Sequence, residues 1–164
     1  MKKFILEYTA FNVWANERIC STVEKLSDEQ LNQEINSSFS SIKKTLLHIW
    51  DAQLVWLKRL QGISLDAFPS QSFTGTNTEL REGIINTSKQ LHELAENFDD
   101  AALDSVRKYA TLKGGIVTSA TYQVLAHVVN HGTYHRGQLI TMFRQCGVTE
   151  IPQLDLIYFY REKK

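Results

Sequence analysis

The chain has 164 residues, 43% of them hydrophobic, with eight glycines and two prolines, which predicts one compact domain over residues 1–164. Eighteen basic side chains balance eighteen acidic ones, so no net positive field attracts nucleic acid or an anionic membrane. Glu7 and Asn16 interrupt the apolar N-terminal residues before a signal-peptide core or a membrane span can form. Cys20 and Cys146 are too few for a disulfide framework. We expect a cytoplasmic protein that binds neither nucleic acid nor membranes.

Apolar residues recur at steps of three and four along most of the chain, which predicts helices. The first helix is expected over 4–25, and Ser27 with Gln30 has the form of a capping box for a short helical turn. A second helix is expected from Ser40 or Ser41 to residue 60, ended by Gly62.

The middle of the chain contains a loop, a third helix and a short hairpin. Segment 63–75 contains Pro69 and several serines and threonines, which is typical of a loop. Thr76 and Glu79 form another capping box, and an apolar stripe follows it to residue 98. Between residues 105 and 117 the pattern changes to that of a hairpin around Lys113 and its two following glycines.

A long fourth helix follows the hairpin. Thr118 or Ser119 is expected to cap it, and Gly147 is expected to end it. The aromatic tail over 154–160 should pack back on the helices. We therefore expect an all-α protein, a four-helix bundle with long connections and a small β-hairpin between the third and fourth helices. Because the connections are long, the order of the helices in the bundle is not determined at this stage.

The fourth helix presents polar groups on its core face. Steps of three and four from Thr121 lead to His131, His135 and Gln138. Burying such groups without partners costs about 1 to 3 kcal/mol each, so they need hydrogen bonds or a metal ion. Hydrogen bonds are the usual partners of a lone core histidine. Two histidines one turn apart, however, can give two nitrogens to one metal ion.

The spacing leaves open which histidines share an ion. His127 lies one turn before His131, but His127 and His135 are roughly 12 Å apart along the helix axis, so one ion cannot bind all three. A further ligand should come from another helix. His48 lies in a row of small, uncharged side chains on the second helix, whereas His92 has charged neighbours and is expected to be solvated.

Two familiar metal sites are excluded by what the sequence lacks. In the segment HGTYH, Gly132 stands where an H-E-x-x-H protease has its glutamate. No glutamate is followed three residues later by a histidine, as di-iron bundles require. The site is therefore expected to hold a single ion or none.

Three segments resemble the DinB family, and the likeness runs through nearly the whole chain. They are FNVWAN (11–16), LLHIWDAQLVWL around His48, and HVVNHGTYHRGQ (127–138). Position by position, the resemblance places the family's metal ligands on His48, His131 and His135, and leaves His127 as a histidine that is not a ligand. It also implies a variant up-and-down connection order, one divalent ion, zinc or nickel, and a homodimer.

Three imidazoles leave an open position on the ion, and such a position distinguishes catalytic from structural sites. We expect a water or a thiol to bind there and to act as a nucleophile near neutral pH. Relatives of known activity use a low-molecular-weight thiol, so the resemblance implies an enzyme, a metal-dependent thiol S-transferase acting on a small molecule in stress or detoxification. Two alternatives stay open: a metal-dependent hydrolase that uses the bound water, and a non-catalytic, stress-induced metal-binding protein.

Other polar residues near the ligands have less certain roles. Asp51 and Gln138 each lie one turn from a ligand, where they can orient it or hold the incoming thiol. The alternatives are a solvated charge for Asp51 and a core hydrogen bond for Gln138. Arg136 points about 100° away from His135, which favours an interface or an interhelical salt bridge over catalysis.

Overall fold

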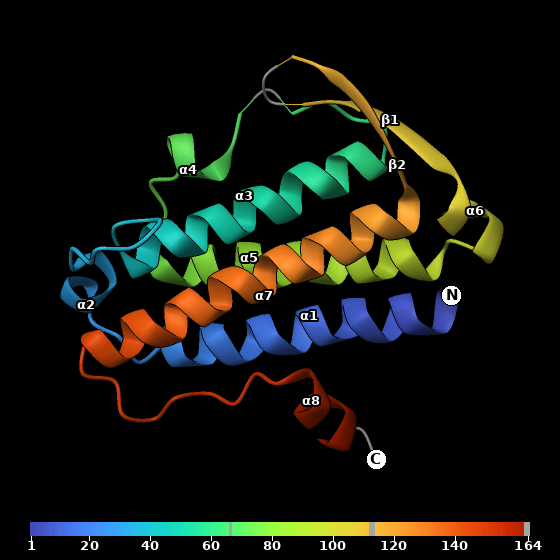
Figure 1. Ribbon diagram of the computed structural model, residues 1–164. Coiled ribbons are helices and arrows are strands. Elements are labelled where there is room, and N and C mark those ends of the chain that lie inside the picture. Colours follow the sequence, from blue (N-terminus) through green and yellow to red (C-terminus); the bar gives the residue numbers. More distant parts are fainter. Residues whose placement is uncertain (66, 112–113, 163–164) are drawn as a thin grey trace.

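The computed structural model describes residues 1–65, 67–111 and 114–162, which form eight helices and one two-stranded antiparallel sheet (Figure 1). The helices are α1 (Lys2–Val23), α2 (Asp28–Asn32), α3 (Ile42–Leu60), α4 (Pro69–Ser72), α5 (Asn77–Glu96), α6 (Asp100–Asp104), α7 (Thr121–Gln145) and α8 (Leu156–Glu162), and the strands are β1 (Val106–Ala110) and β2 (Ile116–Ala120). This confirms the prediction of a mostly helical protein with a small hairpin before the last long helix.

The long helices α1, α3, α5 and α7 lie side by side (Figure 1). Helix α1 packs against α5 and α7, and α3 packs against the same two helices, so α1 and α3 are diagonal to each other. Helices α1 and α7 run in one direction, and α3 and α5 run in the other. Because α3 and α5 follow each other among the long helices and are parallel, the chain returns along the molecule between them. Helix α4 lies in this return and packs against α3.

Local signals set several helix ends as predicted. The hydroxyls of Ser27, Ser41 and Thr76 each accept a hydrogen bond from a backbone N–H in the first turn of α2, α3 and α5. Beyond α3 and α7, Gly62 and Gly147 have φ values of +76° and +80°. Glycine adopts this left-handed conformation without the steric penalty that other residues incur.

Two predictions about where helices begin were wrong. Strand β2 runs to Ala120, so Thr118 and Ser119 pair with β1 and neither caps α7. The β-branched residues that begin this segment favour an extended strand over a helix start. The predicted loop over 63–75 contains the short helix α4, which begins at Pro69, where the fixed φ of proline suits a first helical position.

The hairpin directly precedes α7. Its strands pair from Val106 with Ala120 to Ala110 with Ile116. Gly114 in the turn has a φ of +88°, while Lys113 of the predicted turn lies outside the described residues. The hairpin thus connects α6 to α7 and folds back over the C-terminal end of α3, where Tyr109 packs on Trp56 and Ala110 accepts a hydrogen bond from Arg59 (Figure 1).

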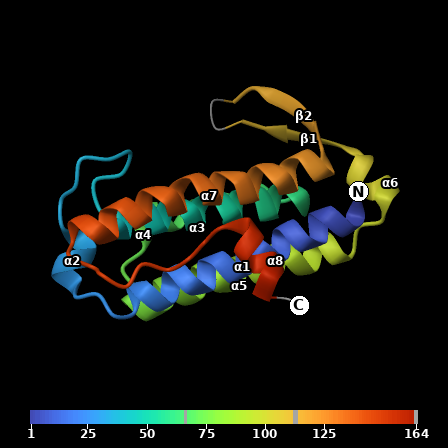
Figure 2. The ribbon, with the colours of Figure 1, turned by 60° about the horizontal axis from the view of Figure 1, so that its bottom comes forward.

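The C-terminal segment packs back on the long helices, as predicted. Helix α8 lies across α1 (Figure 2), and its buried Phe159 contacts Phe11 and Trp14 at ring-centroid distances of 5.8 and 5.6 Å. The main apolar clusters lie between the long helices and include Leu46, Leu57 and Phe143. Nowhere in the described residues is a helix both long and apolar enough to cross a membrane.

Candidate metal centre

Three histidines converge between the antiparallel neighbours α3 and α7. His48 comes from α3, and His131 and His135 lie one turn apart on α7. One ligand atom from each ring can be chosen so that all three atoms lie within 4.8 Å of one another. We call these residues the histidine triad. They could hold a metal ion, and in the described part of the chain no other three His, Cys, Asp or Glu side chains gather in this way.

The separation of the donor atoms suits a single ion. Zinc–nitrogen distances of about 2.0–2.1 Å place two ligands of a tetrahedral ion roughly 3.3 Å apart. Nε2 of His131 lies 3.0 Å from Nε2 of His48. The ring of His135 lies 4.5 Å, centroid to centroid, from each of the other two rings. Small side-chain rotations therefore bring all three donors into range of one ion.

Burial keeps the imidazoles of the triad neutral. Burial, and then the charges of His135, His48 and His127, lower the pKa of His131 to about 4. Burial is also the main cause that lowers the pKa of His48 and of His135. Neutral imidazole is the form that binds a metal ion. The triad can therefore bind a cation at pH 7 without first losing protons.

Gln138 fixes the orientation of His135. Its Oε1 lies 2.8 Å from Nδ1 of His135, and its Nε2 donates to Oγ of Ser38 at 2.8 Å. Since the amide oxygen can only accept, Nδ1 of His135 carries the proton and Nε2 is left as the ligand atom. The hydrogen bond predicted for Gln138 is thus made to a member of the triad.

The segment before α3 covers one side of the triad, and the sequence did not reveal this. The ring of Phe39 stacks on His48 at 4.2 Å and lies 5.6 Å from His135. Ser38 accepts the hydrogen bond from Gln138. These residues belong to no periodic pattern, and the one available signal was an aromatic residue within a polar stretch.

The remaining two histidines lie outside the triad. His127 packs between Trp56 and His131, at ring-centroid distances of 5.2 and 5.7 Å. His92 is not the solvated side chain that its charged neighbours predicted. It is partly buried between α5 and α1, with Nδ1 2.8 Å from the hydroxyl of Thr9. Its neighbours in sequence were a poor guide because the contact comes from a different helix.

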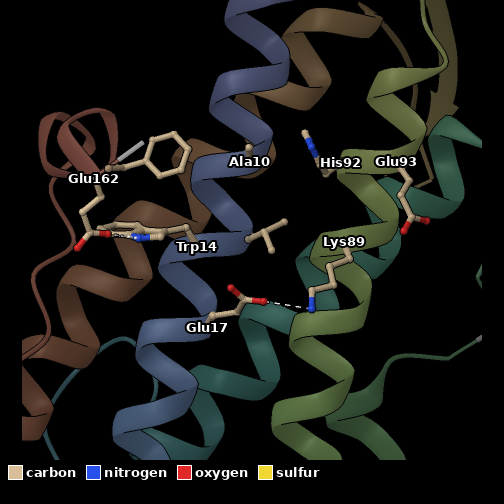
Figure 3. Close-up of a pocket in the computed structure, with 9 residues that line it drawn as sticks. Ala10, Trp14, Glu17, Lys89, His92, Glu93 and Glu162 are labelled. Carbon is tan, nitrogen blue, oxygen red and sulfur yellow. Dashed lines mark hydrogen bonds and ion pairs between the residues drawn. The ribbon is translucent and has the colours of Figure 1, made fainter. Parts of the chain in front are cut away.

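His92 lines a pocket of about 470 Å³ between α1, α5 and α8 (Figure 3). Much of the polar lining is already paired: Lys89 with Glu17 at 3.1 Å, and the Trp14 indole with Glu162 at 2.8 Å. The histidine triad lies between the other two long helices, so this pocket is separate from it.

A pocket of about 270 Å³ opens beside the triad. His48 and His131 line it together with Phe68, which directly precedes α4, and with other residues of α3. Asp51 also lines it, and its Oδ1 accepts a hydrogen bond from the backbone N–H of Ser70 in α4 at 3.0 Å. Asp51 therefore holds α4 against α3 at the edge of the pocket, which is a role the sequence did not predict.

Arg136 lies buried on another face of α7, and the salt bridge predicted as one alternative is not what holds it. Its Nη1 donates to Oδ1 of Asn12 and of Asn16 at 2.8 and 2.9 Å, and its Nη2 donates to the hydroxyl of Thr133 at 2.9 Å. Gln53 in turn accepts from both asparagine side chains. Burial lowers the pKa of Arg136 to about 10, so the guanidinium stays charged at pH 7. Neutral oxygens of two asparagines on α1 and of Thr133 on α7 satisfy this cation, and no carboxylate is required.

Comparisons with known proteins agree with the resemblance. The model of the DinB family matches residues 1–162. The chain is 31% identical to "Protein DinB" of Bacillus subtilis (strain 168) over 169 residues, which cover 99% of this chain and 98% of that protein. It also resembles the crystal structure of a DinB-like protein from Bacillus cereus ATCC 10987, with a TM-score of 0.61, 20% identity, and coverage of 85% and 89% of the two chains. The structural likeness supports the fold alone, and the sequence matches show that the chain belongs to the DinB family.

Proposed function

We propose that His48, His131 and His135 hold one divalent metal ion, zinc or nickel, and that the protein is a metal-dependent thiol S-transferase acting on a small molecule in stress or detoxification. The observation that carries this proposal is the convergence of three neutral imidazoles beside an open pocket. A structural zinc site uses four protein ligands, whereas a catalytic site uses three and keeps one position open. Three imidazoles match the second kind in ligand number, which supports a catalytic role.

A divalent ion in such a site supplies Lewis acidity, which lowers the pKa of a coordinated water or thiol towards neutrality. The side chains of this chain supply the rest. Gln138 holds His135 in the tautomer that leaves Nε2 available. Phe39 covers one face of His48. The pocket lined by Phe68 and Asp51 gives a small molecule access to the triad.

We further infer that residues 1–164 form one domain and that the four long helices make a four-helix bundle with the variant up-and-down order expected of the family. The pairing of α1 and α3 with the same two neighbours supports this order. The homodimer and the cytoplasmic location expected from the sequence stay predictions.

Metal analysis of protein purified without a histidine tag tests the first half of the proposal. The wild type should contain one ion per chain, and His131→Ala should lose most of it. His127→Ala is the matched control, because His127 contacts His131 without belonging to the triad. A wild type without stoichiometric metal, or equal losses in the two variants, would refute the assignment.

A substrate panel tests the second half. Electrophiles that react only when metal and an added thiol are both present would support S-transfer. Turnover of a model ester without thiol would instead favour the hydrolase, because water alone then serves as the nucleophile. Fully metallated protein with no turnover in either panel would favour the non-catalytic alternative.

A further inference from the structure

We propose that a second pocket, adjoining the one beside the triad, binds the anionic end of an elongated ligand whose other end lies at the triad. This outer pocket, of about 330 Å³, lies between the end of α3, segment 62–65 and β1. It shares Val55, Arg59 and Phe68 with the pocket beside the triad. The inference rests on the proposed function, because it assigns the inner pocket to the reacting end of the ligand.

Arg59 stands where the two pockets meet, and its guanidinium is held in place. The group lies 4.6 Å from the ring of Trp56 and 5.1 Å from that of Tyr109. One of its nitrogens donates to the carbonyl of Ala110 at 2.8 Å. An arginine has five N–H donors in a rigid fork, so donors remain for a ligand after this bond is made. A fixed fork of this kind suits the two oxygens of a carboxylate.

The outer pocket carries positive charge that no acidic side chain among its described lining residues balances. Lys108 of β1 lines it together with Arg59. In the described part of the chain, neither cation makes an ion pair. Burial also lowers the pKa of Arg59, as expected for a cation that has lost water without gaining an anion. The pocket in Figure 3 differs, because its Lys89 is paired with Glu17.

Helix geometry sets the length of the ligand. The interval from His48 to Arg59 on α3 corresponds to about 16 Å along the axis, at about 1.5 Å per residue. Both side chains lean towards the N-terminus of α3, but arginine is the longer of the two, so the guanidinium reaches back further than His48 does and shortens this distance. A peptide thiol with a carboxylate two residues from its sulfur spans roughly 7 Å, and the metal–sulfur bond and the hydrogen bond to the guanidinium extend this to roughly 12 Å. A carboxylate-bearing molecule of peptide size is therefore the ligand class that can contact both sites.

The test compares glutathione, an anionic peptide thiol, with its diethyl ester, in which both carboxylates are blocked. Protein loaded with cobalt(II) reports thiol binding through cobalt–thiolate charge-transfer absorbance. On the wild type, glutathione should half-saturate the site at a concentration at least tenfold lower than the ester, as expected for hydrogen bonds to a charged group. Arg59→Gln should raise the value for glutathione to that of the ester and leave the ester unchanged.

Two further substitutions separate recognition from general effects. Arg59→Lys keeps the charge but loses the fork, so it should retain part of the preference for glutathione. Arg144→Gln removes a cation at the far end of α7, outside both pockets, and should keep the whole preference. Equal binding of the two thiols by the wild type would overturn the proposal, as would an Arg59→Gln variant that binds both more weakly by the same factor.

A second measurement keeps failure of the metal site distinct from failure of the outer pocket. Calorimetric titration of metal-free protein with S-methylglutathione, which cannot offer a thiolate, should show binding that Arg59→Gln abolishes. Absence of cobalt uptake would refute the metal site, and this titration would still decide the outer pocket. Normal cobalt and thiol binding without charge discrimination would refute only the outer pocket.

Discussion

Gln138 lies one turn beyond His135 on α7, and its Oε1 accepts the Nδ1 proton of that imidazole across 2.8 Å. The same amide donates to Ser38 in the segment before α3. Two hydrogen bonds thus connect a histidine of the triad to the segment that also carries Phe39 over His48. The orientation of His135 and the cover over the triad therefore depend on each other.

Gln138→Leu should weaken metal binding about 10- to 100-fold, the usual loss when the hydrogen-bond partner of a histidine ligand is removed. The leucine keeps the volume of the side chain but leaves Nδ1 of His135 without its acceptor. Competition with a chromophoric chelator at pH 7.5 measures the affinity. Ser38→Ala, which removes only the outer hydrogen bond, should have a smaller effect. Equal affinity in Gln138→Leu and the wild type would show that the bond does not orient the ligand.

Features set by local sequence were predictable. Ser27, Ser41 and Thr76 cap helices because a side-chain oxygen needs only a backbone N–H two or three residues away. His131 and His135 share a face because helical spacing places residues four apart together. His48 needed the family resemblance, since no local rule brings a residue of α3 to α7.

Features set by packing between distant segments were not predictable. Phe39 lies over His48 only because the segment before α3 folds back over the triad. Arg136 found its acceptors on α1, more than a hundred residues earlier in the chain. A salt bridge is a reasonable expectation for a helical arginine, but here the amide oxygens of Asn12 and Asn16 accept the hydrogen bonds instead of an acid.

The stability of the metal-free protein should fall as the pH is lowered from about 6.5 towards 4. The pKa of His131 is about 4 in the folded protein and about 6.5 in an unfolded chain. Between these values the unfolded state binds more protons, so its population rises as the pH falls. The lowered pKa of His48 and of His135 acts in the same direction.

Urea unfolding in the presence of a chelator, repeated at intervals from pH 7.5 to 4.5, measures this dependence. Glutamine in place of His131 cannot bind the proton, so His131→Gln should lose less stability over this range than the wild type. The prediction would be wrong if both proteins showed the same slope, or if the wild type gained stability as the pH fell.

Arg136→Met should lower the free energy of unfolding by about 3 kcal/mol. The substitution keeps an apolar chain in the buried position but leaves Oδ1 of Asn12 and of Asn16 without their donor, and unsatisfied buried polar groups cost about 1 to 3 kcal/mol each. Chemical unfolding measures the loss. Arg144→Met, at an exposed position on the same helix, should change stability by less than about 0.5 kcal/mol. Similar values for the two variants would show that the buried network does not stabilise the fold.

Gly132 lies one turn before Arg136 on α7, between His131 and His135 in the sequence. Because it has no side chain, it leaves room for the hydrogen bonds between Arg136 and the asparagines of α1. A Cβ at Gly132 would lie 2.8 Å from Nη1 of Arg136 and 3.1 Å from Oδ1 of Asn12, whereas a Cβ at Gly137 would meet nothing within 4 Å. Alanine gains about 0.5–1 kcal/mol over glycine inside a helix, but overpacking a buried site costs about 1–3 kcal/mol. Gly132→Ala should therefore destabilise the protein, and Gly137→Ala should stabilise it.

A double-mutant cycle identifies the cause. Because the added methyl group of Gly132→Ala collides with the Arg136 guanidinium, which three hydrogen bonds prevent from moving aside, its destabilising effect should shrink or reverse in the Arg136→Met background. Unfolding free energies of the four proteins give the coupling directly. An unchanged effect of Gly132→Ala in both backgrounds would place the strain elsewhere. A reversed sign would show that the buried arginine requires a glycine at position 132. Packing against Arg136, and not the metal site, would then explain why HGTYH lacks the protease glutamate.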